Sequence, residues 1–258
     1  DGDTRVQVED GGDIGVIRFA INGQEKMVLR TNSYNRARLE IKDDNLNTFF
    51  GDSTGLITDI GTWNTGFGHK ALFFNTAGSN NTANGNGALY SNSVGSNNTA
   101  LGMQALSFNN AGNNNTSVGM LSLLSNTIGS SNTAIGVQAM YSNRANSRST
   151  AIGRSALQFA HDGTAGTSTY NTAVGYEALK GSSLASANTG TYNTAIGDQA
   201  LNSNSNGSYN SALGVSALLS NTVGQLNTGI GVGALLSNTT GTYNTATGAS
   251  SLVSNIGG

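Results

Sequence analysis

The sequence predicts an all-β chain in which a parallel β-solenoid, or β-roll, of about twelve 17-residue coils follows a small antiparallel β module. Three observations lead to this prediction. A unit of the form Asn-Thr-Ala-Ile-Gly-x-x-Ala-Leu recurs, as at residues 98–106, 132–140 and 193–201, and its opening residue returns every 17 residues apart from two steps of 22. The chain has 36 Gly, no Pro and no Cys, and only 10% of its residues are charged. Self-similarity at a fixed period is the signature of stacked supersecondary units rather than of one globular core.

Individual positions of the unit predict specific backbone and side-chain roles, counting the opening Asn as position 1. At position 1 we expect an asparagine ladder, because stacked amides satisfy one another where an isolated buried amide would cost free energy. Position 5 is Gly in every unit, which indicates a turn that needs a positive φ or has no room for a Cβ. The units begin at residues 47, 64, 81, 98, 115, 132, 149, 171, 193, 210, 227 and 244. The turn glycines include Gly102, Gly119, Gly136, Gly153, Gly175, Gly197, Gly214 and Gly231.

The other positions of the unit predict how the chain continues around each coil. Position 4 is mostly β-branched or Leu, and positions 8 and 9 are Ala-Leu or close variants. A segment of the type Ser-Asn-Thr-x-Gly follows, as at residues 125–129. We therefore expect each unit to contain a short strand, a glycine turn, a second short strand and a looser Asn/Gly turn.

Residues 1–46 differ in character and form an expected N-terminal β module that caps or attaches the repeat array at 47–258. Apolar and polar residues alternate over 17–21 and again over 26–30, with an Asn-Gly pair between the two runs. This combination is a strong hairpin signal. Residues 37–41 alternate in the same way and predict a further half-buried strand.

The apolar content of one coil predicts that the chain associates with other copies. Each unit offers about two large apolar side chains, whose burial contributes roughly 3–6 kcal/mol. Ordering the backbone of such a unit costs on the order of 17–34 kcal/mol. Hydrogen-bond ladders recover part of this difference, but a lone thin solenoid has too little core. We expect several chains to pack along a common axis.

The repeat over residues 47–258 resembles the head repeats of trimeric autotransporter adhesins, which use a shorter Asn-Ser-Val-Ala-Ile-Gly-type unit. It is more similar to the Asn-Thr-Ala-Ile-Gly-x-x-Ala-Leu arrays of phage and bacterial tail-fibre proteins. Residues 17–30 also resemble segments that precede such arrays. The resemblance implies a parallel homotrimer of left-handed parallel β-rolls, with the glycine-terminated strand near the three-fold interface.

The sequence predicts no enzyme, no cofactor and no metal site. His69 and His161 lie about five coils apart, too far to share a metal ion or a proton relay. The Asp-Asp-Asn run at 43–45 has two interpretations, a calcium site or a polar turn at the end of the module. The net charge of -2 gives no electrostatic case for nucleic acid. No apolar run has the length of a membrane-spanning helix, so membrane insertion is not expected.

The two 22-residue units are neighbours, at 149–192, and each carries its five extra residues in the second half of the coil. Adjacent long loops on a solenoid often form a binding face, so we expect a receptor-binding surface here. The alternative is that the extra residues are variation in loop length that the fold tolerates and that has no binding role. The candidate receptor-binding residues are His161, Asp162, Thr164, Lys180, Ser182 and Ser183.

An aromatic residue precedes the opening Asn of five units. We expect these rings to pack between coils, with a platform for sugar rings as the alternative. The aromatic residues are Trp63, Tyr170, Tyr192, Tyr209 and Tyr243.

These observations favour a structural and adhesive fibre protein. We expect a trimeric β-solenoid shaft or head that displays a receptor-binding surface, for a host glycan or protein, outside a virion or on a cell-surface appendage. Two alternatives stay open. One is that the chain is a subunit of an extracellular filament whose subunits join end to end. The other is that the chain is an ice-binding solenoid whose regular threonine rows contact the ice.

Overall fold

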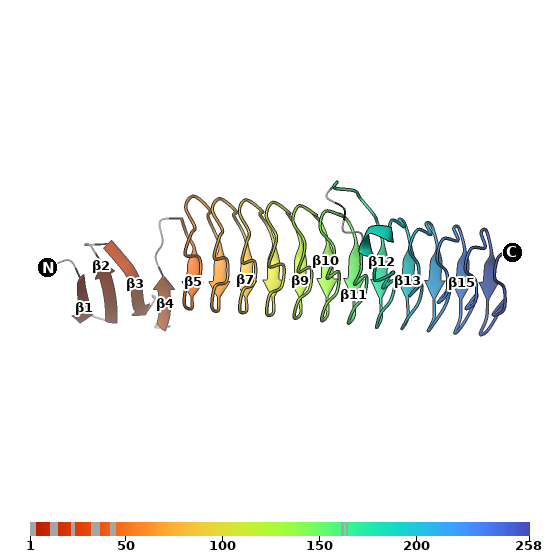
Figure 1. The fold of residues 1–258 in the computed structure, drawn as a ribbon. Helices are drawn as coiled ribbons and strands as arrows, with labels where there is room; N and C mark the ends of the chain where they lie inside the picture. Colours follow the sequence, from red (N-terminus) through yellow and green to blue (C-terminus); the bar gives the residue numbers. More distant parts are fainter. Residues whose placement is uncertain are drawn as a thin grey trace.

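The computed structural model describes residues 4–10, 15–21, 24–31, 37–41, 45–160, 163 and 165–258. The described chain contains a four-stranded antiparallel sheet and a twelve-stranded parallel sheet. In Figure 1 the twelve strands stack one above another along a rod, and the antiparallel sheet lies beyond its β5 end. The predicted all-β fold with a solenoid of twelve coils is confirmed.

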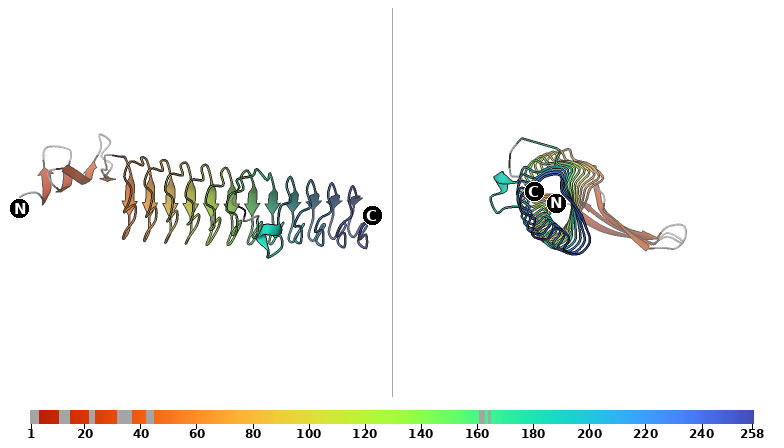
Figure 2. Two further views of the ribbon diagram at one scale, coloured as in Figure 1. Left: turned by 45° about the horizontal axis from the view of Figure 1, so that its top comes forward. Right: turned by 90° about the vertical axis from the view of Figure 1, so that its right-hand side faces the viewer.

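The antiparallel sheet has the strand order β1-β2-β3-β4, with β1 at Thr4–Asp10, β2 at Gly15–Ile21, β3 at Gln24–Thr31 and β4 at Ala37–Ile41. Strands β2 and β3 form the predicted hairpin, while its Asn-Gly turn lies outside the described residues. Strand β4 confirms the prediction for 37–41, and β1 is a strand that the sequence did not predict. Figure 2 shows this sheet extending to one side of the coil outline.

The solenoid sheet is built from twelve three-residue strands that pair in parallel with identical registers, so that position 2 of one coil lies over position 2 of the next. Each strand starts one residue after the opening residue of its unit. The strands are β5 (Thr48–Phe50), β6 (Thr65–Phe67), β7 (Thr82–Asn84), β8 (Thr99–Leu101), β9 (Thr116–Val118), β10 (Thr133–Ile135), β11 (Thr150–Ile152), β12 (Thr172–Val174), β13 (Thr194–Ile196), β14 (Ser211–Leu213), β15 (Thr228–Ile230) and β16 (Thr245–Thr247).

The core of each coil is smaller than the sequence suggests. In the coil that contains β10, Ala134, Ala139 and Met140 are buried, and the equivalent positions 3, 8 and 9 form the core of the coils between the first and the last. Ile135 at position 4 points away from this core and is exposed. The expectation of about two large buried side chains per coil is therefore wrong. One large residue and two small ones fill most coils, because successive strand residues point to opposite faces.

The prediction of a second short strand after the glycine turn is also wrong, because this segment consists of turns. Its residues alternate in the sign of φ, with Gln138 at 59° and Met140 at 51°. Positive φ curls the chain and takes it out of the β region. The backbone still bonds from coil to coil: the N–H of Gln138 donates to the carbonyl of Met120 at 3.0 Å, and that of Met140 to Ala156 at 3.0 Å.

Position 5 requires glycine for both of the predicted reasons. All twelve turn glycines have φ between 120° and 139°. A Cβ placed on Gly136 would also lie 2.4 Å from the carbonyl oxygen of Gly153 in the next coil. The interior turn therefore excludes any side chain by its backbone conformation and by the spacing of the coils.

Two asparagine ladders run inside the solenoid. At position 1, the predicted ladder is confirmed: Asn81 donates its backbone N–H to Oδ1 of Asn64 at 3.0 Å, and the pattern repeats in other coils. A second buried ladder lies at position 12, where Nδ2 of Asn109 donates to Oδ1 of Asn92 at 2.6 Å. The second turn is consequently not looser than the first, because its asparagine is buried and bonded to the neighbouring coil.

Candidate binding surface at the two long coils

The second insert follows strand β12, extends from the rod and carries the short 3-10 helix η1 at Ala185–Ala187 (Figure 1). Of the extra residues after β11, the structure describes 163 and 165. Asn188 joins the second insert to the first long coil: its Nδ2 donates to the carbonyls of Phe159 and Ser182, and its Oδ1 accepts the N–H of Ser182 at 2.9 Å. An amide that is bonded on both sides fixes the second loop against the first long coil. The second insert is thus held against the neighbouring long coil.

The residues predicted for receptor binding are only partly described. His161, Asp162 and Thr164 lie outside the described residues. Lys180 lies at the base of the second insert, where its Nζ is 2.7 Å from Oε1 of Glu177. Ser182 is half-buried by its bonds to Asn188, and Ser183 is exposed.

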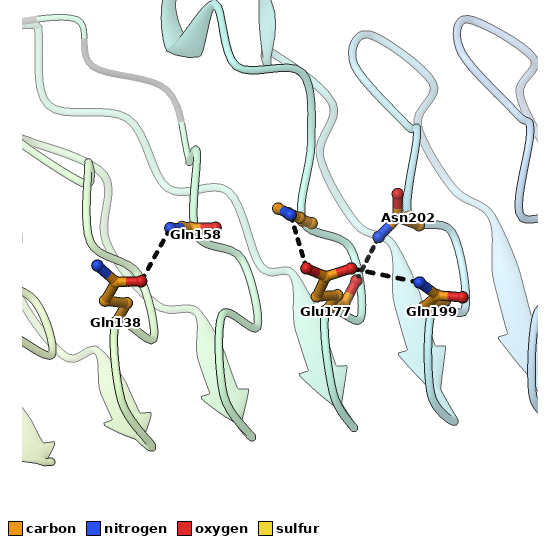
Figure 3. Close-up of polar contacts among 6 residues, drawn as sticks. Gln138, Gln158, Glu177, Gln199 and Asn202 are labelled. Carbon is orange, nitrogen blue, oxygen red and sulfur yellow. Dashed lines mark hydrogen bonds and ion pairs between the residues drawn. The ribbon is translucent and has the colours of Figure 1, made fainter.

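Two groups of polar side chains that the sequence interpretation missed lie beside these loops: a Gln138–Gln158 pair and a polar cluster around Glu177 (Figure 3). Nε2 of Gln158 donates to Oε1 of Gln138 at 3.3 Å. Nε2 of Gln199 donates to Oε2 of Glu177 at 3.3 Å, and Asn202 donates to the carbonyl of Glu177 at 3.1 Å. The only signal in the sequence is the run of long polar side chains at positions 7 and 10 of consecutive units.

The hydrogen bond from Lys180 lowers the pKa of Glu177 below its usual value, against the opposing effect of burial, and the bond from Gln199 lowers it further. The side chain of Glu177 is only 16% exposed. The carboxylate is thus charged and bonded on both oxygens at neutral pH. These bonds fix the side chain of Glu177 in place. The charges of Glu177 and Lys180 cancel, so the pair adds no net charge to the cluster.

Both asparagine ladders change at the long coils. Ser149 replaces Asn at position 1, where it donates its N–H to Asn132 and its Oγ accepts the N–H of Asn171 at 3.2 Å. The position-12 ladder stops at Asn143 and resumes at Asn204, because the long coils carry Ala and Ser there. A cavity of about 20 Å³ lies between these residues, which is room for one water molecule.

The aromatic residues before the opening Asn stack on one another in this part of the rod. The ring centroids of Tyr170 and Tyr192 are 4.9 Å apart, and those of Tyr192 and Tyr209 are also 4.9 Å apart. Arg148 lies over the ring of Tyr170 and donates to its hydroxyl, which lowers the pKa of Tyr170. The rings cover one another's faces, so packing between coils is confirmed for these three residues.

Among the described residues, no group of three His, Asp or Glu side chains could hold a metal ion. His69 is half-exposed, with its Nε2 3.5 Å from Asp52 and its Nδ1 3.2 Å from the amide of Asn86. The two aspartates of the 43–45 run lie outside the described residues. The described part of the chain contains no helix with the length and apolar character needed to cross a bilayer.

The outward face of the parallel sheet combines a threonine row with an apolar row. Position 2 is Thr in every coil except the one with Ser211, and these residues lie in register along the rod. Large apolar residues are exposed at position 4 and, directly after the turn glycine, at position 6. They are Phe50, Phe67, Leu101, Ile135, Ile152, Ile196, Leu213 and Ile230 at position 4, and Met103, Met120, Val137, Tyr176, Val215 and Val232 at position 6.

Comparisons with protein-family models, with curated proteins and with solved structures find no match for this chain. The function is therefore argued from the geometry described above.

Proposed function

We propose that this chain is a structural and adhesive fibre segment. It assembles as a parallel homotrimer and displays a receptor-binding surface outside a virion or on a cell-surface appendage. The observation that supports this proposal most directly is the exposed apolar row beside the turn glycines. Its role is mechanical and adhesive, without a catalytic step or a cofactor, and without nucleic-acid binding or membrane insertion.

Association of copies follows from the apolar row. Leu101 is 46% exposed although it has apolar neighbours at the same position in the following coils. Continuous exposed apolar surface marks a site of interaction. Covering one half-exposed side chain of this size contributes on the order of 1 kcal/mol. The row runs along most of the rod, so parallel chains in register cover it at many levels together.

The adhesive part of the proposal rests on the inserts. A solenoid built from nearly identical coils presents a uniform surface, and the long coils at 149–192 interrupt that surface with bonded loops. They lie next to the polar cluster around Glu177, whose amides offer both donors and acceptors. Three copies of one such surface on a trimer engage a cell surface with increased effective concentration.

The oligomeric state and one matched pair of variants test the proposal. We expect sedimentation and native mass measurements to give three chains. Leu101→Asp on the apolar row dissociates or unfolds the assembly, because it places a charge in the covered face. Val94→Asp is the control, since Val94 is exposed to a similar degree, at 51%, in the neighbouring coil and outside that row. A folded wild-type monomer at micromolar concentration contradicts the proposal.

The outward threonine row supports ice binding as a second candidate. In strand β8 both Thr99 and Leu101 are exposed, and a hydroxyl row beside an apolar row repeats along the parallel sheet. Thermal hysteresis of the wild-type protein tests this function directly. Activity in a monomer that Thr99→Tyr abolishes would favour ice binding over a trimeric fibre, because the same face cannot be both buried and in contact with ice.

A further inference from the structure

A groove on the second-turn side of the rod comes from a local change of residue size. At position 11 the sequence has Phe108, then Ser125 and Ser142 in the next two coils, and then Phe159. Two small residues between two large ones leave a hollow. The groove has a volume of about 530 Å³ and is lined by Phe108, Ser125, Thr127, Ser142 and Arg144. The hollow is broadly open to solvent, so it suits a surface-bound ligand such as part of a chain rather than an enclosed small molecule.

The lining residues offer three kinds of contact. Phe108 is 51% exposed and presents an apolar ring. Arg144 is exposed, and none of the ion pairs among the described residues involves it. Ser125 and Ser142 line the groove, and their side chains make no hydrogen bond to another described residue, so these hydroxyls are available to a ligand. One phenylalanine, one arginine and two serines with available hydroxyls therefore line one hollow, while the hydroxyl of Thr127 donates to the carbonyl of Arg144 at 2.9 Å.

The groove lies next to the first insert. A Cβ placed on Gly166 would be 3.5 Å from the carbonyl oxygen of Ala145 and 3.8 Å from Cδ1 of Ile128. Ala145 follows Arg144 in the chain, and Ile128 follows Thr127. The end of the first insert thus packs on the two turns that form one wall of the groove. Positions 11 and 13 belong to the second turn and not to the parallel strands, so a trimer that packs through the outward face of those strands leaves the groove open.

We propose that this groove binds a carboxylated pyranose, a hexuronate unit of an anionic polysaccharide. The guanidinium of Arg144 pairs with the carboxylate, for which its planar geometry is suited. The ring of Phe108 packs on the apolar face of the sugar, and the serine hydroxyls bond to the sugar hydroxyls. This inference rests on the proposed adhesive function, which it deepens by naming the ligand class.

The length and charge of the groove support one or two sugar units. The groove runs from the coil of Phe108 to the coil of Ser142 and Arg144, two coils apart, which is about 10 Å at the usual strand spacing. A single arginine matches one carboxylate per site. The net charge of -2 provides no wider cationic field of the kind that binds nucleic acid. A sugar acid therefore fits better than a densely charged polyanion.

The experiment measures binding of the full chain to oligosaccharides that contain glucuronate or galacturonate, each compared with its neutral counterpart. We expect the acidic sugars to bind and the neutral ones to bind at least tenfold more weakly. Arg144→Gln and Phe108→Ala each weaken binding of the acidic sugars by about tenfold or more. Matched controls are Arg154→Gln and Phe74→Ala, which change an exposed arginine in a neighbouring coil and a phenylalanine at position 11 outside the groove.

Several results overturn the inference. Acidic and neutral sugars that bind equally well remove the role of the carboxylate. Unchanged affinity in Arg144→Gln, or an equal loss in the control variants, removes the groove as the site. A wild-type trimer that attaches to cells but binds no uronate refutes the ligand class and leaves the proposed function standing. A monomer without attachment refutes the proposed function, whatever its affinity for uronates.

Discussion

The turn glycines at the C-terminal end of the array separate two effects that coincide elsewhere in the solenoid. Gly231 and Gly248 have similar backbone conformations, with φ of 125° and 120°. A Cβ on Gly231 would lie 2.6 Å from both the carbonyl carbon and oxygen of Gly248. A Cβ on Gly248 would meet no atom within 4 Å. Gly248→Ala therefore tests the backbone conformation alone, whereas Gly231→Ala tests the backbone conformation together with the spacing of the coils.

The expected losses of stability differ accordingly. Gly248→Ala incurs only the strained φ, about 1–3 kcal/mol. Gly231→Ala incurs the same strain and also pushes the last coil away. It therefore weakens bonds such as the one from the N–H of Gly248 to the carbonyl of Ile230 at 2.8 Å. Each backbone bond lost adds about 1 kcal/mol, for a total of about 3–5 kcal/mol. The two positions are one coil apart, so fraying of the end affects them similarly.

Thermal and urea unfolding of the two variants, followed by circular dichroism, measures the difference. A lower melting temperature for Gly231→Ala than for Gly248→Ala is expected, with wild type highest. Gly136→Ala in the interior should resemble Gly231→Ala, because its Cβ meets the next coil in the same way. Equal melting temperatures for Gly231→Ala and Gly248→Ala would refute the argument, since coil spacing would then contribute nothing to the requirement for glycine.

Three further predictions concern the turn, the ladder and the polar cluster. Ser216→Gly should stabilise the protein by about 0.5–1 kcal/mol in urea titrations, because Ser216 has a φ of 55° that costs less for glycine; a loss of stability would contradict this. Asn109→Ala should cost about 1–3 kcal/mol, because it removes two donated bonds and the acceptor of Asn126. A cost near zero would show that the ladder is replaceable by water. The pKa of Glu177 is lowered in the folded state, so its contribution is present above the unfolded value near 4.5 and is lost as the pH falls through the folded value. As the pH is lowered from 6 to 2, the melting temperature of Glu177→Gln should therefore fall less than that of wild type. Equal falls in the two proteins would show that the bond between Glu177 and Lys180 does not contribute to the acid sensitivity of the fold.

The candidate site shows how far sequence patterns reach. Two steps of 22 residues located the inserts, because an insertion in a strict repeat is visible as a change of period. The period does not show which side chains meet around a loop. The bond from Asn188 to Phe159 joins residues 29 positions apart, and it depends on the path of both loops. The groove at Phe108 and Arg144 was missed for a related reason, since it comes from residue size at one position across three coils.

The sequence by itself determined the number of coils, the strand register, the turn glycine and the first asparagine ladder, since each of these repeats with the period of the unit. Only the tertiary structure decided which side of the strand is covered. Ile135 belongs to the same apolar repeat as Met140, yet it is exposed while Met140 is buried. Strand alternation turns Ile135 outward, whereas Met140 lies in the turn segment after the glycine, where the coil curls back and places its side chain in the core. Local sequence favours an apolar residue at both positions, and the path of the coil decides which one forms the core and which one is left for a partner.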